Sequence, residues 1–186
     1  MQQALDAGVK FFQYRNKDSA RKGIYETALM LARIARNAQS LFIVNDHADI
    51  AAAVGADGVH LGQDDLPIEF ARKLFARDKL IGISTHSLEQ AVSAEASGAD
   101  YIGFGPIFPT TTKEAGKTLG IRNLAIIRQT VSLPVIAIGG IKHTNLQDVI
   151  HSGADGVAVI SAILSAGNIT TAAESMLRSI SDVRRA

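Results

Sequence analysis

The sequence contains no cysteine, which excludes disulfide bonds and thiolate chemistry and makes a reducing, cytoplasmic location the expected one. Its formal net charge is only +1, which argues against a protein that binds nucleic acid or a membrane surface through a basic excess. No apolar run reaches the roughly 18 residues of a membrane span. What is present is a chain of 186 residues, 47% of them hydrophobic, which predicts a single domain over 1–186 with a buried core.

Several sequence motifs that are typical of a particular cofactor, metal or reaction are also missing. No glycine fingerprint for a dinucleotide follows the first predicted strand. No Gly-x-Ser-x-Gly elbow is found, so Ser84 and His86 do not indicate nucleophilic hydrolysis although they lie two residues apart. The five histidines lack the spacing of zinc ligands. These absences predict a site without zinc and without a covalent catalyst.

A repeated turn organises the chain. Gly-Ala-Asp occurs at 55–57, 98–100 and 153–155, and a looser relative lies at 7–11. Each copy follows a segment with helical spacing and precedes a short β-prone run. Glycine suits the left-handed residue that ends a helix, and aspartate favours a tight turn into a strand. The chain therefore repeats the order helix, short turn, strand.

The apolar runs predict strands at 10–15, 41–44, 57–60, 80–83, 100–104, 134–138 and 156–160. Helical patterns lie between them, near 18–38, 47–53, 67–76, 87–96, 121–130, 144–151 and 170–183. Apolar strands that alternate with helices indicate a parallel sheet covered by helices, either doubly wound and open or closed as a (β/α)8 TIM barrel. The barrel is favoured because polar residues recur after nearly every strand, where a barrel has its active site.

One strand of the expected barrel is not found in the sequence. A (β/α)8 barrel has eight strands, whereas the sequence predicts seven, and residues 2–7 look like the end of a helix. The first strand is therefore expected to be missing from this chain. An unpaired sheet edge favours association, so we expect a homo-oligomer such as a dimer, or a marginally stable monomer.

The polar residues after the first three strands predict a cation and an anion at one rim. Gln13 and Arg15 alternate along a strand and Lys17 follows, which points to an anionic ligand unless this is only a solvated strand end. Asp46 and Asp65 follow two adjacent strands, where carboxylates can hold Mg²⁺ with the help of phosphate oxygens. Taken alone, Asp46 is expected to cap the following helix rather than to bind a metal.

Later strand ends carry further polar groups. The loop 105–117 (GPIFPTTTKEAGK) has hydroxyls and ammonium groups suited to pyrophosphate oxygens and flanking glycines that allow movement, although a solvated loop is the alternative. Ser84 follows the 80–83 strand, where Ser84 or Ser87 could instead cap a helix. Gly140 allows close approach of the backbone, and a short helix is expected to begin near Ser161, so a phosphate site is predicted there.

Taken together, the motifs resemble those of the thiamine-phosphate synthase family. They occur in that family's order over nearly the whole chain, and they are Gln-Tyr-Arg-Asn-Lys at 13–17, Val-Asn-Asp at 44–46, Gly-Val-His-Leu-Gly-Gln-Asp-Asp at 58–65, Gly-Ile-Ser-Thr-His at 82–86, Gly-Pro-Ile-Phe-Pro-Thr-Thr-Thr-Lys at 105–113, Ala-Ile-Gly-Gly-Ile at 137–141 and Gly-Val-Ala-Val-Ile-Ser at 156–161. Each motif alone is weak, whereas the set is specific.

The resemblance implies a transferase that joins a hydroxymethylpyrimidine diphosphate to a thiazole phosphate or its carboxylate, releasing pyrophosphate. It implies that the pyrimidine diphosphate is bound by Gln13, Arg15, Lys17, Asn45, Ser84 and Lys113. It implies that the thiazole phosphate is bound by Thr110, Thr112, Gly140, Ile160 and Ser161. Asp46 and Asp65 would hold Mg²⁺, and Arg15, Ser84 and Lys113 are the expected catalytic residues.

Two other functions stay open at this point. A thiazole tautomerase shares the barrel and the thiazole phosphate, but it would not need the Gln-Arg-Lys set, both aspartates or the threonine loop. A non-catalytic protein that binds thiamine phosphate is the second alternative, and release of pyrophosphate from the two substrates separates all three.

Overall fold

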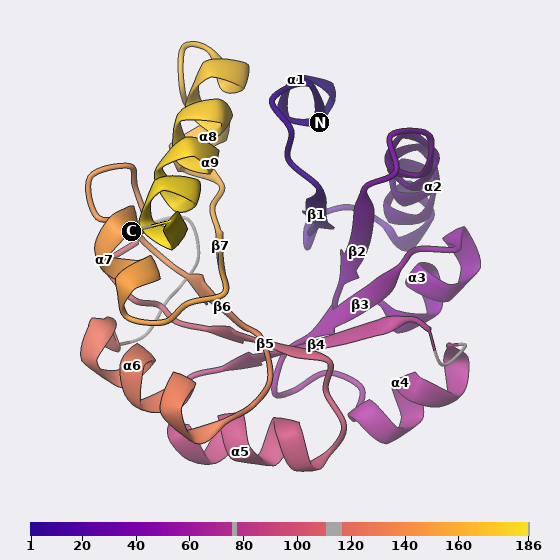
Figure 1. Ribbon diagram of the computed structural model, residues 1–186. Coiled ribbons are helices and arrows are strands. Elements are labelled where there is room, and N and C mark those ends of the chain that lie inside the picture. The colour runs from indigo at the N-terminus through magenta and orange to yellow at the C-terminus, as the bar shows by residue number, and fades with distance from the viewer. Residues whose placement is uncertain (76–77, 111–116, 186) are drawn as a thin grey trace.

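The computed structural model describes residues 1–75, 78–110 and 117–185 of the chain. Within these residues, all strands lie in one parallel sheet whose spatial order follows the sequence. The strands are β1 (Phe11–Tyr14), β2 (Leu41–Asn45), β3 (Gly58–Leu61), β4 (Leu80–Thr85), β5 (Tyr101–Phe104), β6 (Val135–Ile138) and β7 (Gly156–Ala158). Figure 1 shows that the sheet is strongly curled, with β1 and β7 at its two edges.

Helices cover the convex side of this curled sheet and form the outer layer of the molecule (Figure 1). They are α1 (Gln2–Asp6), α2 (Arg21–Asn37), α3 (Ala48–Val54), α4 (Ile68–Leu74), α5 (Leu88–Ala96), α6 (Gly120–Thr130), α7 (Leu146–His151), α8 (Ser161–Leu164) and α9 (Ile169–Arg185). α2 illustrates the packing, since Ile24, Ala28 and Ala32 recur at every fourth position and are buried. Such a stripe is what a helix needs to cover a sheet.

The main core lies between the sheet and the helices. Phe42 and Val44 on β2, and Ile81 and Ile83 on β4, alternate along their strands and are buried in one cluster with the helical residues. Alternate residues point to opposite faces of a sheet, so the intervening positions face the concave side. The concave side holds polar and aromatic side chains, and several of them belong to the candidate site.

The outer layer continues across the gap between the edge strands. α9 packs against α7, α8 and α1. The hydroxyl of Thr170 on α9 donates a hydrogen bond to the Gln3 carbonyl at 3.1 Å, and Ala4 on α1 and Ala173 on α9 are both buried. The first and last helices of the described chain therefore contact each other, although β1 and β7 are not paired with each other in the described sheet.

The three Gly-Ala-Asp turns do more than connect a helix to a strand. The carboxylate of Asp57 accepts a hydrogen bond from the Phe42 N–H at 2.8 Å, and Asp100 and Asp155 accept in the same way at the starts of β4 and β6. In each turn the aspartate N–H also donates back to the carbonyl of the strand residue. The repeated aspartate thus extends the strand pairing by one side chain, a role that the turn preference alone does not predict.

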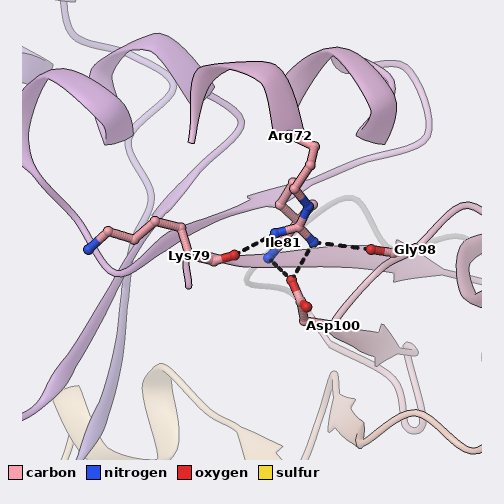
Figure 2. A network of polar contacts seen from close by, with 5 residues as sticks. All are labelled: Arg72, Lys79, Ile81, Gly98 and Asp100. Atoms are coloured by element: carbon pink, nitrogen blue, oxygen red, sulfur yellow. Dashed lines mark hydrogen bonds and ion pairs between the residues drawn. The ribbon is translucent and has the colours of Figure 1, made fainter. Parts of the chain in front are cut away.

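Arginines from the outer helices support these turns. Figure 2 shows Arg72 on α4 donating to the carbonyls of Lys79 and Gly98 and to the Asp100 carboxylate, which also receives the Ile81 N–H. Arg128 on α6 lies 3.5 Å from Asp155 in a corresponding position. This network ties helix, turn and strand together at the amino-terminal ends of the strands, which leaves the opposite rim for the candidate site.

The sequence predictions for the elements are confirmed in most details. All seven predicted strands are present within two residues of their expected bounds, and a short helix begins at Ser161 as expected. The α/β class and the parallel, barrel-like curl are confirmed as well. Within the described residues, no helix is both long and apolar enough to cross a membrane.

Candidate active site

The candidate residues lie at the carboxyl-terminal ends of the strands, which parallel pairing brings to one rim. Asn45 ends β2 beside His60 of β3 in the strand register, and Ser84 of β4 pairs with Gly103 of β5. Asn45 is buried and Ser84 half-buried, whereas Gln13, Arg15 and Lys17 are exposed. Polar side chains at this rim therefore range from the wall of the concave face to its open mouth.

The two predicted metal ligands are brought together. The Asp65 carboxylate lies near enough to that of Asp46 for the second carboxylate to raise its pKa. Burial raises the pKa of Asp65, the hydrogen bond from the Gly62 N–H opposes this rise, and the nearby Asp46 carboxylate raises the pKa again. Lys17 lies 3.5 Å from Asp46 and offsets part of the negative charge. Two carboxylates that repel each other in this way provide a place for a cation.

Local backbone geometry sets the position of each carboxylate. Asp46 has a left-handed backbone with φ of 65°, and its N–H donates to the His60 carbonyl of the neighbouring strand at 2.8 Å. Asp65 is held by the Gly62 N–H, which donates to its Oδ2 at 2.7 Å. The following helix α3 begins after His47 and has no side-chain cap. The alternative role of Asp46 as a helix cap is therefore not seen.

Ser84 does not cap a helix either. Ser87 caps α5, because its hydroxyl accepts the Gln90 N–H at 3.2 Å. The Ser84 hydroxyl instead lies 2.9 Å from Nε2 of His60, while Nδ1 of His86 contacts the Gly105 carbonyl at 2.5 Å. The histidine beside Ser84 in space is thus His60, from a different strand, and not the histidine beside it in sequence.

The two strand ends predicted to bind the thiazole phosphate are adjacent. Ile138 of β6 pairs with Ala158 of β7, which places Gly140 and Ile160 two residues beyond paired positions. Gly140 has φ of 65°, and a Cβ there would lie 2.5 Å from the carbonyl oxygen of Pro109. Ile160 and Ser161 are exposed at the start of α8. The glycine therefore allows Phe108 and Pro109 to pack onto the end of β6.

The base of the 105–117 loop is fastened at this same place. The N–H groups of Ile107 and Phe108 donate to the carbonyls of Ile138 and Gly139 at 2.9 and 3.0 Å. Where the loop returns, the Leu119 N–H donates to the Pro106 carbonyl at 2.8 Å. Thr110 is half-buried just beyond this base. Two of the predicted residues, Thr112 and Lys113, lie outside the described residues.

Two interior residues of the site were not predicted as site residues. Tyr101 starts β5 and His60 lies on β3, and their buried side chains contact each other on the concave face with 3.1 Å between Oη and Nδ1. Both lie in short apolar strands, which conceals them in the sequence. The available signal was period-two spacing, because Gln13, His60, Ser84 and Tyr101 all fall on the inward-facing set of their strands.

One hollow of the surface lies at the other end of the sheet. A cavity of about 620 Å³ is lined by Pro134, His151, Asp155 and Arg184, at the amino-terminal ends of β6 and β7. That end of the sheet holds the aspartate turns and their arginines. The candidate site is therefore assigned from the converging polar groups at the opposite rim. Among the described residues, no group of three or more acidic, histidine or cysteine side chains forms a metal cluster.

Comparison with known proteins gives a consistent picture. The sequence pattern of the family described as thiamine monophosphate synthase matches residues 1–163. A thiamine-phosphate synthase of Chloroflexus aurantiacus is 48% identical over 174 residues, which are 93% of this chain and 80% of that protein. One of Shouchella clausii is 45% identical over 186 residues, which cover 98% of this chain and 88% of the relative.

Solved structures agree in fold. A thiamine phosphate pyrophosphorylase from Pyrococcus furiosus superposes with a TM-score of 0.91 at 40% identity, covering 98% of this chain and 88% of the other. A 3-hexulose-6-phosphate synthase from Salmonella typhimurium reaches a TM-score of 0.79 at 16% identity, covering 98% and 91%. The second likeness concerns the fold alone, because its sequence identity is low.

Proposed function

The chain belongs to the thiamine monophosphate synthase family, and from this premise we propose that it joins a hydroxymethylpyrimidine diphosphate to a thiazole phosphate or its carboxylate. The products are thiamine phosphate and pyrophosphate, together with carbon dioxide when the carboxylate is the substrate. The similarity to curated thiamine-phosphate synthases along almost the whole chain carries this proposal. The pairing of two carboxylates beside a lysine at the strand ends supports it.

The pyrimidine diphosphate is proposed to bind where β1 to β4 end. Arg15 and Lys17 neutralise the diphosphate, because both are cations at the mouth of the concave face. Gln13, Asn45 and Ser84 supply neutral hydrogen-bonding groups along the wall below them. Lys113 is proposed to add a further ammonium group to the leaving pyrophosphate. A neutral polar wall beneath an exposed cationic mouth suits a ligand with a heterocyclic end and an anionic end.

Asp46 and Asp65 are the residues proposed to hold Mg²⁺. The fit of this pair to a cation rests on their mutual approach, which raises the pKa of Asp65 in addition to the effect of burial. Two carboxylates are the usual protein contribution for Mg²⁺, which retains waters and recruits phosphate oxygens. When bound, Mg²⁺ would neutralise charge on the diphosphate. Lys17 would share that task from the side of Asp46.

The reaction is proposed to be dissociative. The bond between the exocyclic carbon of the pyrimidine and the diphosphate oxygen breaks, and the bonding electrons leave with pyrophosphate. The electron-rich aminopyrimidine stabilises the cation, which the ring nitrogen of the thiazole then attacks. The protein needs no nucleophile for this chemistry, only cations for the leaving group and a positioned acceptor. Arg15, Lys113 and the Ser84 hydroxyl are the proposed catalytic groups.

The thiazole phosphate is proposed to bind at the ends of β6 and β7. Gly140, Ile160 and Ser161 would offer backbone groups to its phosphate. Thr110 and Thr112 would contact the thiazole from the loop. The packing of Gly140 against Pro109 supports this arrangement, since it joins the phosphate end to the base of that loop.

The fold proposal goes one step beyond the seven described strands. We propose the (β/α)8 architecture with its first strand absent from the described residues, which leaves β1 and β7 as the edges of the sheet. The curl of the sheet and the contact of α1 with α9 support it. An unpaired edge favours association through that edge, so a homo-oligomer is the expected state. Sedimentation equilibrium checks this, and a stable monomer at all concentrations would contradict it.

Release of pyrophosphate tests the proposed function. The purified chain is supplied with both substrates and Mg²⁺, pyrophosphate is followed by a coupled assay, and thiamine phosphate is identified by mass spectrometry. We expect both products in equal amounts and neither product when one substrate is omitted. Binding of thiamine phosphate without turnover would instead indicate a non-catalytic binding protein. Isomerisation of the thiazole substrate alone would indicate a tautomerase.

A further inference from the structure

A chain of hydrogen bonds crosses the concave face from β1 to β4. Tyr101 Oη lies 3.1 Å from His60 Nδ1, and His60 Nε2 lies 2.9 Å from Ser84 Oγ. The side chain of Gln13 hydrogen-bonds to Tyr101 at the other end. Two proposed substrate contacts, Gln13 and Ser84, are therefore joined by two interior side chains that have no role in the mechanism given above.

The sheet is built to bring these two rings together. The strand register pairs His60 with Gly82 and Gly82 with Tyr101, so the three residues form one row across β3, β4 and β5. A Cβ on Gly82 would lie 2.1 Å from an atom of the Tyr101 ring. Because glycine leaves that space free, the two rings meet over β4 with their centroids 5.5 Å apart. Ser84 lies two residues further along the same face, toward the mouth.

The direction of each hydrogen bond follows from the environment. Burial raises the pKa of Tyr101, so its phenol keeps its proton and can donate. The bond from Gln13 opposes this rise, which identifies the Gln13 amide as a donor to the phenol oxygen. The Tyr101 proton then points to Nδ1 of His60. A neutral imidazole that accepts at Nδ1 carries its proton on Nε2, so His60 donates to Ser84.

We propose that Tyr101 and His60 are positioning residues that hold the Ser84 hydroxyl as a hydrogen-bond donor to the pyrimidine diphosphate. The assignment rests on the proposed function, which places that substrate beside Ser84. Since Ser84 Oγ accepts from His60, its own proton is free to point toward a ligand at the mouth. Ser84 is half-buried at the end of β4, which allows this contact.

The same geometry gives the serine and histidine a different role from that in a hydrolase. In a nucleophilic pair the histidine nitrogen accepts the serine proton and activates the oxygen. In the proposed tautomer Nε2 of His60 is the donor, because the Tyr101 phenol donates to Nδ1. Ser84 is therefore an oriented donor and no activated nucleophile, which agrees with a dissociative reaction. A donor fixed before the substrate arrives avoids reorganisation during the reaction.

Variants of the two interior residues test the assignment by single-turnover pyrophosphate release at saturating substrates. His60→Leu should lower the rate by about 10- to 100-fold, because small misplacements of catalytic groups have effects of that size. His60→Gln should recover most of it, since an amide nitrogen can donate to Ser84. Tyr101→Phe keeps the ring and should lower the rate in the same direction. His151→Gln and Tyr25→Phe, at exposed helical positions, should keep the wild-type rate.

The same changes made in a Ser84→Ala variant distinguish a positioning role from a general loss of structure. In Ser84→Ala, the further change His60→Leu or Tyr101→Phe should alter the rate less than about twofold, because both act through the serine hydroxyl. The KM for the thiazole phosphate should stay constant throughout. Equal fold-losses in both backgrounds, or a wild-type rate in His60→Leu, would overturn the assignment. An inactive wild-type chain would overturn the proposed function and this assignment with it, whereas independent losses in an active enzyme overturn this assignment alone.

Discussion

Arg72 on α4 and Asp100 in the turn before β5 form an ion pair with 2.6 Å between Nη2 and Oδ2, and the same carboxylate oxygen accepts the Ile81 N–H at 2.7 Å (Figure 2). One aspartate thereby connects an outer helix, a turn and the start of a neighbouring strand. Both side chains of the pair are partly buried, with 28% and 35% of their surface exposed. This position makes the aspartate more important for stability than an ion pair on the open surface.

We expect Asp100→Ala to lower the free energy of unfolding by about 1–3 kcal/mol, because it deprives the Ile81 N–H and the Arg72 guanidinium of their acceptor. Asp100→Asn should lower it less, since the amide oxygen still accepts from Ile81. Glu174→Ala, which breaks the exposed pair with Arg178 on α9, should stay within about 0.5 kcal/mol of the wild type. Urea denaturation measures all three, and equal stability of Asp100→Ala and Glu174→Ala would contradict the prediction.

The glycine between the two interior rings gives a second prediction. Gly82→Ala should reduce the free energy of unfolding by about 1–3 kcal/mol, because the added methyl group overlaps the Tyr101 ring. Gly23→Ala in α2 is the matched control, since its Cβ meets nothing closer than 3.9 Å and alanine favours a helix by roughly 0.5–1 kcal/mol. The two changes should thus shift the thermal midpoint in opposite directions. A shift in the same direction would show that the interior accommodates the methyl group.

The metal proposal predicts a specific loss at Asp65. Asp65→Asn should raise the Mg²⁺ concentration required for turnover, because a neutral amide binds a hard cation more weakly than a carboxylate does. Asp46→Asn should act in the same direction, whereas Asp64→Asn, at the exposed neighbouring position, should keep the wild-type Mg²⁺ dependence. Circular dichroism checks that the fold is intact. Unchanged Mg²⁺ dependence in both Asp46→Asn and Asp65→Asn would reject the assignment.

Removal of the metal gives an independent prediction. Treatment with a chelator should abolish pyrophosphate release while leaving the thermal midpoint nearly unchanged, because Mg²⁺ is expected to bind mainly together with the diphosphate. Added Mg²⁺ should restore the activity. Full activity in the presence of excess chelator would remove Mg²⁺ from the proposed mechanism without affecting the assignment of the family.

The 105–117 loop gives the last prediction. Lys113→Ala should lower the single-turnover rate by about 10²–10³-fold at saturating substrates, because the ammonium group acts on charge that grows as pyrophosphate leaves. Thr112→Val removes one hydroxyl at nearly constant shape and should mainly raise the thiazole phosphate concentration that is required. Lys117→Ala, exposed near the end of the loop, serves as the control. A wild-type rate in Lys113→Ala would make the loop a solvated connection.

Much of the fold was predictable because the pattern is local. Strands β3 and β5 are short and mostly apolar, and each follows a helix that ends near a glycine, so alternation and turn chemistry determine their place. The functions of single turn residues were less accessible. Asp57, for example, was expected to favour a turn, whereas its carboxylate reaches back to the Phe42 N–H, fifteen residues earlier. Such a contact depends on which strands become neighbours.

The candidate site likewise contains residues that the sequence predicted and residues that only the structure revealed. The sequence indicated Asp46 and Asp65 because each follows a strand, and parallel strands end at a common rim. It named Ser84 but not His60 as a site residue, whereas the structure places His60 against the serine. His60 and Tyr101 belong to β3 and β5, and only the row that they form with Gly82 brings them into contact across β4.

The sequence by itself thus determined the order of helices and strands, the rim at which polar residues gather and the family, because these depend on periodicity, turn residues and motifs within short segments. Tertiary structure alone decided which carboxylates approach each other, which histidine meets Ser84 and how the aspartate turns hold the preceding strands. These are contacts between residues far apart in the chain. They are set by strand register and by the space that a glycine leaves in a neighbouring strand, and neither is fixed by any one segment.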